Sequence, residues 1–282
     1  MSSLLKVVVV CALFFSSWVH AKEESPILVS WKGDFQQGAL LIGTLTSAEV
    51  VSVETKKRTL IINDQRSFGL GLGRDFDKQI ELIFHMKDGS KVSQSYQVKK
   101  REYKIQKVEG VPQRTVTPDP EHLKRIRAEA AKVKKARAQS GDMSHYMESY
   151  IWPAKGLISG VYGSQRYYNG KPGRPHFGLD IAAPKGTPVT APASGVVVLA
   201  ENDLFFSGGT AVVDHGHGIN SSFLHMSKLD VKVGQVLKQG DKIGEVGATG
   251  RATGAHLDWR MNWFDQRVDP RLLMSTSVPP KQ

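Results

Sequence analysis

Short apolar runs separated by turn residues fill the chain from about residue 27 to residue 108. Runs of this kind that end at Gly, Asp or Ser are typical of strands rather than helices. Residues 80–84 and 93–98 flank the turn signal at residues 87–90 (KDGS), and this arrangement predicts a β-hairpin. We therefore expect residues 22–113 to form a small β-sandwich-like accessory domain.

One segment of this region alternates glycine with apolar residues, at Gly69, Gly71 and Gly73. A glycine-rich loop that binds a nucleotide phosphate needs a helix directly after it, and no helical pattern follows here. The glycines instead indicate a strand or bulge that another part of the chain approaches closely.

A basic helical linker is predicted for residues 114–148. Asp119 can cap a helix, and Pro120 suits its first turn. Apolar residues then recur at helical spacing, at Leu123, Ile126, Ala130 and Val133. Lys and Arg cover the remaining surface. We interpret the segment as a linker helix docked by its apolar stripe onto a neighbouring domain. The alternative is a basic helix that lies against an anionic wall polymer or a membrane surface.

The second domain is expected at residues 149–274. Its apolar runs are short and end at glycine or proline, and they show no long helical period. Glycines such as Gly234 and Gly240 supply sharp turns between them. The pattern favours a mainly antiparallel β domain, followed by a flexible tail over residues 275–282. The fold class predicted for the whole chain is therefore mainly β.

The start of the chain is typical of a cleaved secretory signal peptide over residues 1–21. Lys6 precedes an apolar run, and residues 19–21 (VHA) form a small-residue cleavage pattern. The alternative is an uncleaved N-terminal anchor. After cleavage we expect an exported protein without a transmembrane segment, located in the periplasm of a Gram-negative bacterium. Cys11, the only cysteine, would be removed, which leaves no thiol for a disulfide or a metal.

Composition adds one constraint on the partner. With 40% hydrophobic and 23% charged residues, wholesale disorder is excluded. The formal net charge of +11 favours an anionic partner, although it does not identify one.

The candidate chemistry lies in the second domain. His176 and Asp180 are spaced as H-x-x-x-D, so both side chains can reach one point, and both residue types bind zinc. His256 and Asp258 share one face of a strand, so that one can bind a metal while the other faces the same cavity. His225 ends an apolar run and can face that cavity too, where a neutral imidazole can assist a metal-bound water.

A further histidine pair, His215 and His217, is a weaker candidate for metal binding. Both residues lie in a glycine-flanked turn (DHGHG), where a histidine is more often structural.

Residues from about 152 to 263 resemble the lysostaphin/LytM family of zinc metallopeptidases. The matching segments include H-F-G-L-D, V-D-H-G-H-G-I, F-L-H-M-S and T-G-A-H-L-D, in an order and spacing that are specific. The resemblance implies a two-sheet antiparallel β-fold of the duplicated hybrid motif type, with one zinc ion in a groove. The preceding region resembles, more weakly, the accessory region of exported proteobacterial members.

By position, the resemblance assigns metal binding to His176, Asp180 and Asp258, and catalytic assistance to His225 and His256. The chain departs from the family at Asp258, where the family has the second histidine of H-x-H. Aspartate also binds zinc, but two carboxylates make a harder and more anionic ligand set.

Two functions are compatible with these residues. The first is a zinc-dependent DD-endopeptidase that cleaves peptidoglycan cross-links by metal-activated water in cell wall remodelling. The second is a non-catalytic LytM-like module that binds peptidoglycan or activates other cell wall hydrolases. Competent groups at all five site positions favour the enzyme, whereas Asp258 supports the module. Neither function involves nucleic acid.

Overall fold

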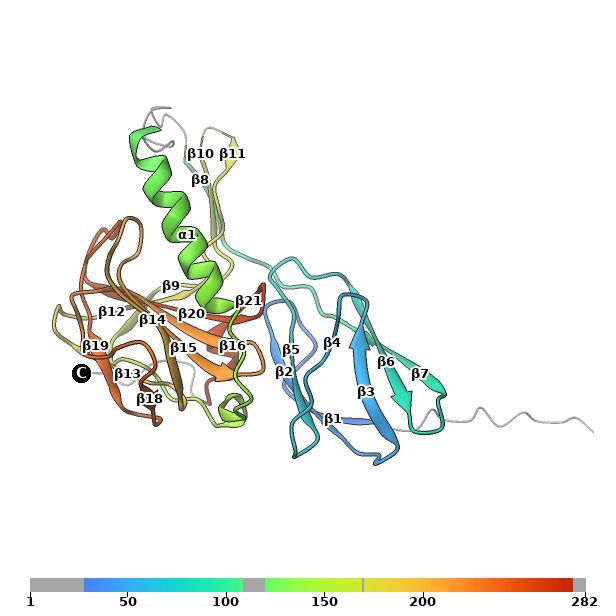
Figure 1. Ribbon diagram of the computed structural model, residues 1–282. Coiled ribbons are helices and arrows are strands. Elements are labelled where there is room, and N and C mark those ends of the chain that lie inside the picture. Colours follow the sequence, from blue (N-terminus) through green and yellow to red (C-terminus); the bar gives the residue numbers. More distant parts are fainter. Residues whose placement is uncertain (1–27, 109–119, 169, 276–282) are drawn as a thin grey trace, which may run out of the picture.

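The computed structural model describes residues 28–108, 120–168 and 170–275. Strands dominate these residues, which confirms the expected mainly β fold (Figure 1). The predicted signal peptide, the capping role of Asp119 and the predicted tail beyond residue 275 lie outside the described residues. None of the helices in the described part of the chain has the length and apolar character that crossing a membrane requires.

The N-terminal part forms two sheets around a shared apolar core. One sheet has the order β1-β2-β5 and the other the order β4-β3-β6-β7. The strands are β1 (Val29–Lys32), β2 (Leu40–Leu45), β3 (Val50–Thr55), β4 (Arg58–Thr59), β5 (Ser67–Gly71), β6 (Gln79–Met86) and β7 (Lys91–Gln97). Leu41, Phe68 and Phe84 are fully buried in this core. Strands β6 and β7 pair antiparallel, which confirms the predicted hairpin.

The C-terminal part contains two antiparallel sheets, as expected. The larger has the order β18-β14-β15-β16-β20-β12-β9, with β21 paired to β20. Its strands are β9 (Leu157–Gly160), β12 (Leu179–Ala182), β14 (Gly195–Leu204), β15 (Gly208–Gly216), β16 (Ile219–Met226), β18 (Val236–Leu237), β20 (His256–Trp263) and β21 (Gln266–Val268). The smaller sheet consists of β13 (Pro188–Thr190), β19 (Lys242–Glu245) and β17 (Lys228–Leu229).

Strand β20 separates the apolar core from a polar face of the larger sheet. Leu257, Trp259 and Met261 are fully buried and belong to the core. Side chains alternate along a strand, so Asp258 and Arg260 project from the opposite face. This opposite face carries the polar residues described below.

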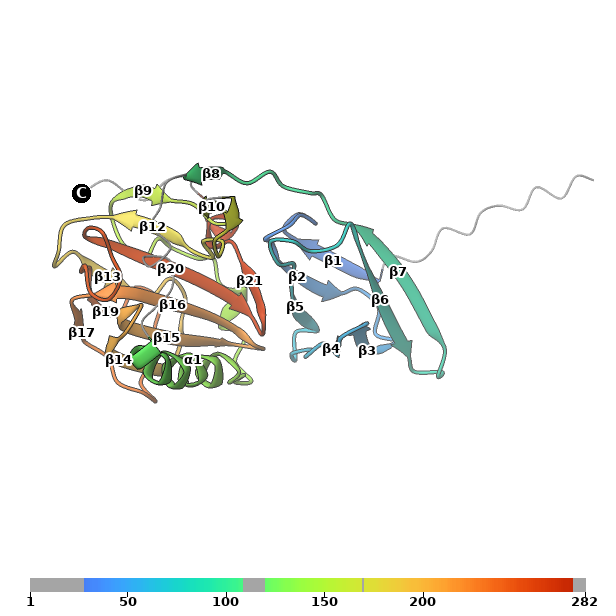
Figure 2. The same ribbon diagram turned by 90° about the horizontal axis from the view of Figure 1, so that it is seen from above.

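Two elements flank that polar face (Figure 2). Helix α1 (Leu123–Arg137), preceded by the 3-10 turn η2 (Pro120–His122), lies on one side, over β14 and β15. A small sheet lies on the other side, where β8 (Ile105–Val108) pairs parallel with β10 (Gln165–Tyr168), which also pairs with β11 (Lys171–Pro172). Two further 3-10 turns, η3 (His145–Met147) and η4 (Pro270–Leu273), complete the described elements.

Only part of the predicted apolar stripe docks helix α1. Val133 packs into a small cluster with Ala136 and the sheet residues Leu199, Leu204 and Val212. Ala130 is exposed, so the stripe is shorter than its spacing suggests. Polar contacts hold the first half of the helix instead, where Arg125 pairs with Asp203 at 3.0 Å and the N–H of Phe205 donates to Oε2 of Glu129 at 2.7 Å.

The three alternating glycines mark a close contact between the N-terminal sheet and the ends of β16, β20 and β21, as predicted. A Cβ atom on Gly69 would lie 2.6 Å from Cδ1 of Ile219, and one on Gly71 would lie 2.6 Å from Cβ of Trp263. Arg58 adds an ion pair of 2.7 Å with Asp265 at the same contact. The absence of side chains on β5 therefore lets the two parts of the chain pack directly.

Replacement of Gly71 by alanine should weaken this packing. The new methyl group would overlap Trp263 close to its backbone, and overpacking of this kind costs about 1–3 kcal/mol. Urea denaturation of the full chain should show that loss in the free energy of unfolding. The matched control is Gly254→Ala, because nothing lies within 4 Å of a Cβ atom at that position. Equal stability of the two variants would contradict the proposed tight contact.

Candidate metal centre

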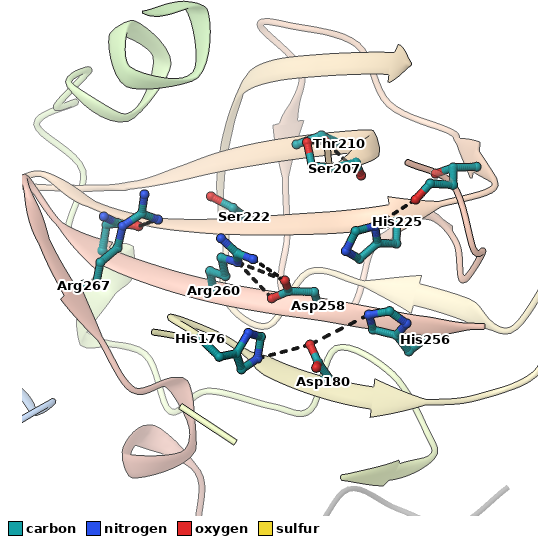
Figure 3. A network of polar contacts seen from close by, with 12 residues as sticks. His176, Asp180, Ser207, Thr210, Ser222, His225, His256, Asp258, Arg260 and Arg267 are labelled. Carbon is teal, nitrogen blue, oxygen red and sulfur yellow. Dashed lines mark hydrogen bonds and ion pairs between the residues drawn. The ribbon is translucent and has the colours of Figure 1, made fainter. Parts of the chain in front are cut away.

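Strand pairing brings the three predicted metal ligands together. Asp180 on β12 lies directly opposite Asp258 on β20, and His176 precedes β12 in the chain. Ligand atoms of these three residues lie within 4.8 Å of one another. Figure 3 shows the three side chains gathered on the polar face of the sheet.

The His176–Asp180 pair has unused bonding capacity. Nε2 of His176 lies 3.2 Å from Oδ1 of Asp180, and neither buried atom has a further hydrogen-bond partner in the described structure. Burial lowers the pKa of His176, whereas the hydrogen bond with Asp180 and the negative charges of Asp258 and Asp180 raise it. The raising effects are the larger, so the pKa of His176 lies above its ordinary value. The negative potential that favours a proton on this imidazole would also favour a metal cation.

Asp258 already has a cationic partner. Both of its carboxylate oxygens accept hydrogen bonds from Nε of Arg260, each at 3.0 Å, and Oδ2 also accepts one from Nη2. The Asp258 side chain is 3% exposed. Burial raises its pKa, but the charge and hydrogen bonds of Arg260 outweigh burial and hold the pKa below the ordinary value. Asp258 is therefore an ionised, bidentate partner of a guanidinium.

These residues fit one zinc ion. An imidazole and two carboxylates form a competent donor set for zinc, and two of the donor atoms lack other partners. A carboxylate can bind a metal and also accept hydrogen bonds from an outer residue, as Asp258 would from Arg260. The fit requires the Asp258 carboxylate to interact with both the zinc ion and the Arg260 guanidinium.

The two predicted catalytic histidines lie beside the three acidic and imidazole ligands. The ring centroids of His225 and His256 are 4.8 Å apart, and Nε2 of His256 is 3.9 Å from Oδ1 of Asp180. Nδ1 of His225 lies 2.8 Å from the carbonyl oxygen of Thr249, and Nδ1 of His256 lies 2.9 Å from that of Gly254. A carbonyl only accepts hydrogen bonds, so both rings carry a proton on Nδ1. In the neutral form, each Nε2 is left as an acceptor.

Burial and backbone geometry further define His225. Burial lowers its pKa below the ordinary value, although the hydrogen bond to the Thr249 carbonyl opposes this. The backbone of His225 has a φ of +64°, which a non-glycine residue rarely adopts. Such strain is common where a side chain must be aimed into a functional site.

Two glycines next to the ligands were not identified from the sequence as site residues. A Cβ atom on Gly160 would lie 2.1 Å from Oδ2 of Asp180, and one on Gly178 would lie 2.2 Å from Oδ1 of Asp258. Gly178 lies within the H-x-x-x-D motif itself. Both positions must lack a side chain because the carboxylates occupy that space.

Arg260 was also missed, although the sequence contained a signal for it. Residues 258 and 260 lie on the same face of a strand, so an arginine two positions after a proposed ligand should contact it. The basic segment that ends at Arg137 likewise contributes one side chain to this face, where Nε of Arg137 donates to Oγ of Ser222 at 3.2 Å.

The weaker pair, His215 and His217, has structural partners. His215 is fully buried, and its ring bonds to the carbonyl oxygen of Ser194 at 2.7 Å and to Oγ of Ser221 at 2.8 Å. Nδ1 of His217 lies 3.1 Å from the carbonyl oxygen of Ile61. These contacts join neighbouring segments and involve none of the three predicted ligands.

Comparisons with known proteins concern mainly the C-terminal part. Residues 174–270 match the model of peptidase family M23. The peptidoglycan DD-endopeptidase ShyA of Vibrio cholerae is 40% identical over 111 residues, which cover 38% of this chain and 26% of ShyA. The cell division protein DipM of Caulobacter vibrioides is 33% identical over 131 residues, which cover 44% of this chain and 21% of DipM. The chain thus spans about a quarter of the length of these relatives.

One solved structure covers both parts of the chain. It is an M23 protein from Pseudomonas aeruginosa, 29% identical, with a TM-score of 0.67 over 86% of this chain and 95% of its own. Most of the two-part arrangement therefore has a counterpart in a solved structure.

Replacement of Gly178 by alanine should disturb the ligand set without removing a ligand. The added Cβ atom would force Asp258 away from its position, and loss of ligand orientation typically weakens metal binding 10–100-fold. Zinc titration of the apoprotein by calorimetry measures the change. Unaltered zinc affinity in a folded Gly178→Ala protein would show that Asp258 does not contribute to zinc binding.

The buried His215 should make stability depend on pH. Burial lowers its pKa from 6.5 to about 4. Between these values the unfolded chain binds a proton that the folded chain does not, so stability falls as the pH is lowered. A difference of about 2.5 units corresponds to about 3 kcal/mol, lost between pH 7 and pH 4. Urea denaturation across this range should show that loss in the wild type relative to His215→Gln, and parallel pH profiles would refute it.

Proposed function

We propose that this chain, whose residues 174–270 form a peptidase family M23 domain, is an exported zinc-dependent endopeptidase that cleaves peptide cross-links of peptidoglycan in the periplasm. The main support is that His176, Asp180 and Asp258 converge beside a pair of histidines. In their neutral form, these histidines, His225 and His256, have Nε2 free to accept a proton. The DD-endopeptidase activity that names ShyA supports the bond type, a D-alanyl to diaminopimelyl link.

His176, Asp180 and Asp258 would hold the zinc ion, which when bound supplies Lewis-acid polarisation of a carbonyl and a nucleophile at neutral pH. Asp180 and Asp258 provide the negative charge that retains the cation. Arg260 holds the Asp258 carboxylate in one orientation through three hydrogen bonds, at the cost of competing for its charge.

His225 and His256 would move and hold protons. Each is oriented by a backbone carbonyl on Nδ1 and so presents Nε2 to the polar face. His225 has a pKa lowered by burial, so at neutral pH it is neutral and can accept a proton. Once protonated, an imidazolium donates from Nε2 and can stabilise an oxyanion or protonate a leaving amine.

The test is digestion of purified sacculi that carry diaminopimelate cross-links, using residues 22–282 loaded with zinc. The wild type should convert cross-linked muropeptides into monomers. His225→Ala should retain zinc while losing about 10²–10⁴-fold in rate, because a positioned general acid–base contributes that much. Asp180→Ala should lose both zinc and activity.

The control for these substitutions is His85→Ala. His85 lies in the N-terminal part, where Nε2 forms an ion pair of 3.0 Å with Glu54, and it should leave digestion unchanged. Absence of bound zinc in the wild type, or digestion that does not depend on His225, would contradict the proposed enzymatic function.

The Asp258–Arg260 ion pair favours a second candidate function. Because a guanidinium already compensates Asp258, the fold does not require a metal at this carboxylate. The protein would then be a non-catalytic module that binds peptidoglycan or activates other cell wall hydrolases. Binding to sacculi without muropeptide release, together with a zinc content near zero, supports this function over the first.

A further inference from the structure

A cluster of arginines continues the polar face beyond Asp258. Arg260 lies two residues from Asp258 on β20. Arg267 lies on β21, the strand paired with β20, beyond Arg260 as seen from Asp258 (Figure 3). Arg137, at the C-terminal end of α1, reaches the same face, because it bonds to Ser222, the residue paired with Arg260 across the sheet. We call Arg137, Arg260 and Arg267 the arginine cluster.

Only one member of the arginine cluster has a carboxylate partner in the described structure. Arg260 is paired with Asp258. Among the described residues, the Arg137 guanidinium makes a single hydrogen bond, from Nε to Oγ of Ser222, and the Arg267 guanidinium makes a single one, from Nη1 to Oδ1 of Asn262 at 3.1 Å. The remaining donors of two half-buried guanidiniums therefore have no partner in the part of the chain that the structure describes.

The fold holds these three positive charges together, and Asp258 is the carboxylate that opposes their effect on one another. Burial, followed by the charges of Arg260 and Arg174, lowers the pKa of Arg267 to about 10. Burial and the charges of Arg267 and Arg260 likewise lower the pKa of Arg137. Partly desolvated like charges destabilise a folded chain, so they are expected where an anion offsets them.

The helix end is fixed so that Arg137 stays at this place. Its carbonyl oxygen accepts a hydrogen bond from Nδ2 of Asn220 at 3.2 Å, and the preceding Ala136 is buried against the sheet. After the helix, the N–H of Gly141 donates to Oδ2 of Asp214 at 2.7 Å. Arg137 is thus positioned by contacts on both its side chain and its backbone.

We propose that the arginine cluster is a subsite that binds a carboxylate of the peptide substrate, beside the bond that is cut. Guanidinium groups present paired donors that match a carboxylate, and two of them here have donors to spare. This inference rests on the proposed function, since the substrate is a peptidoglycan stem peptide. Stem peptides carry free carboxylates on D-glutamate, diaminopimelate and terminal D-alanine.

The position of the subsite limits which carboxylate it can bind. A strand rises about 3.3 Å per residue, so along β20 Arg260 lies about 7 Å from Asp258. Asn262, which bonds to Arg267, lies about 13 Å from Asp258. An extended peptide spans a similar length per residue. The recognised carboxylate therefore lies within about two to four residues of the bond held at the candidate metal centre.

The experiment measures binding rather than turnover. The probe is the tetrapeptide L-Ala-γ-D-Glu-meso-diaminopimelate-D-Ala, compared with an analogue in which all carboxylates are amidated, and calorimetry in the His225→Ala background gives Kd. The free acid should bind at least about tenfold more tightly than the amidated peptide, because a charge-assisted hydrogen bond contributes about 1.5–3 kcal/mol. Arg137→Gln and Arg267→Gln should each remove most of that difference while zinc content stays unchanged.

The matched control is Lys135→Gln, which removes one positive charge from an exposed position on the same helix. It should leave the Kd of both peptides unchanged. Arg137→Lys, which retains the charge but not the fork of donors, should bind the free acid with intermediate affinity and reports on folding of the helix end. Equal binding of the free and amidated peptides, or arginine variants that bind as the Lys135→Gln control does, would overturn the subsite.

The outcome is separable from that of the proposed function. Arginine-dependent binding of the free acid without digestion of sacculi overturns only the endopeptidase. Digestion with binding that is independent of the arginines overturns only the carboxylate subsite.

Discussion

The alternation of side chains along β20 is the constraint on which the rest of the C-terminal structure depends. Leu257, Trp259 and Met261 fill the core between the two sheets, so the strand cannot shift by one residue without exposing them. The same register places Asp258 opposite Asp180 and Arg260 opposite Ser222. Burial of an apolar face thereby determines which charged groups meet on the other face.

The two carboxylates on that face differ in how fully their negative charges are compensated. Arg260 compensates Asp258, whereas Asp180 faces only histidines, with Nε2 of His176 at 3.2 Å and Nε2 of His256 at 3.9 Å. A cation at His176 and Asp180 would therefore gain most from these two residues and less from Asp258. The fold can also tolerate the absence of a metal, because the more deeply buried carboxylate is already paired. This asymmetry explains why one arrangement of residues supports both an enzyme and a binding module as candidates.

Local patterns predicted more of this structure than long-range contacts did. The β-hairpin, the close-packed glycines and the strand-rich fold follow from turn chemistry and from the period of apolar residues, which act over a few residues. The spacing of His176 and Asp180 also sufficed to bring them together. The roles of Gly160 and Gly178 could not be predicted, because the carboxylates that fill the space at these glycines come from paired strands.

Arg260 and Arg137 illustrate two different reasons for a missed residue. Arg260 shares a face with Asp258 because side chains alternate along a strand. Asp258 was predicted to be a metal ligand, and an ion pair between it and Arg260 was therefore not considered. Arg137 appeared as one of several basic residues covering a helix, and nothing local distinguished it from the exposed Lys134 and Lys135. Its position depends on where α1 ends against β16, which is a tertiary contact.

The linker is consequently part of the site's architecture rather than a simple tether. The last turn of α1 is bonded to β16, and the segment after it is bonded to β15 through Asp214. On the other side of the polar face, β8 leads from the N-terminal part and pairs with β10 of the C-terminal part. The face that carries His176 and Asp180 is therefore flanked on both sides by chain that precedes residues 174–270, the part that matches the M23 family model (Figure 2). A relative that shared only the matched residues 174–270 would have the predicted ligands without these flanks, so the surroundings of the candidate site would differ even where the predicted ligands agree.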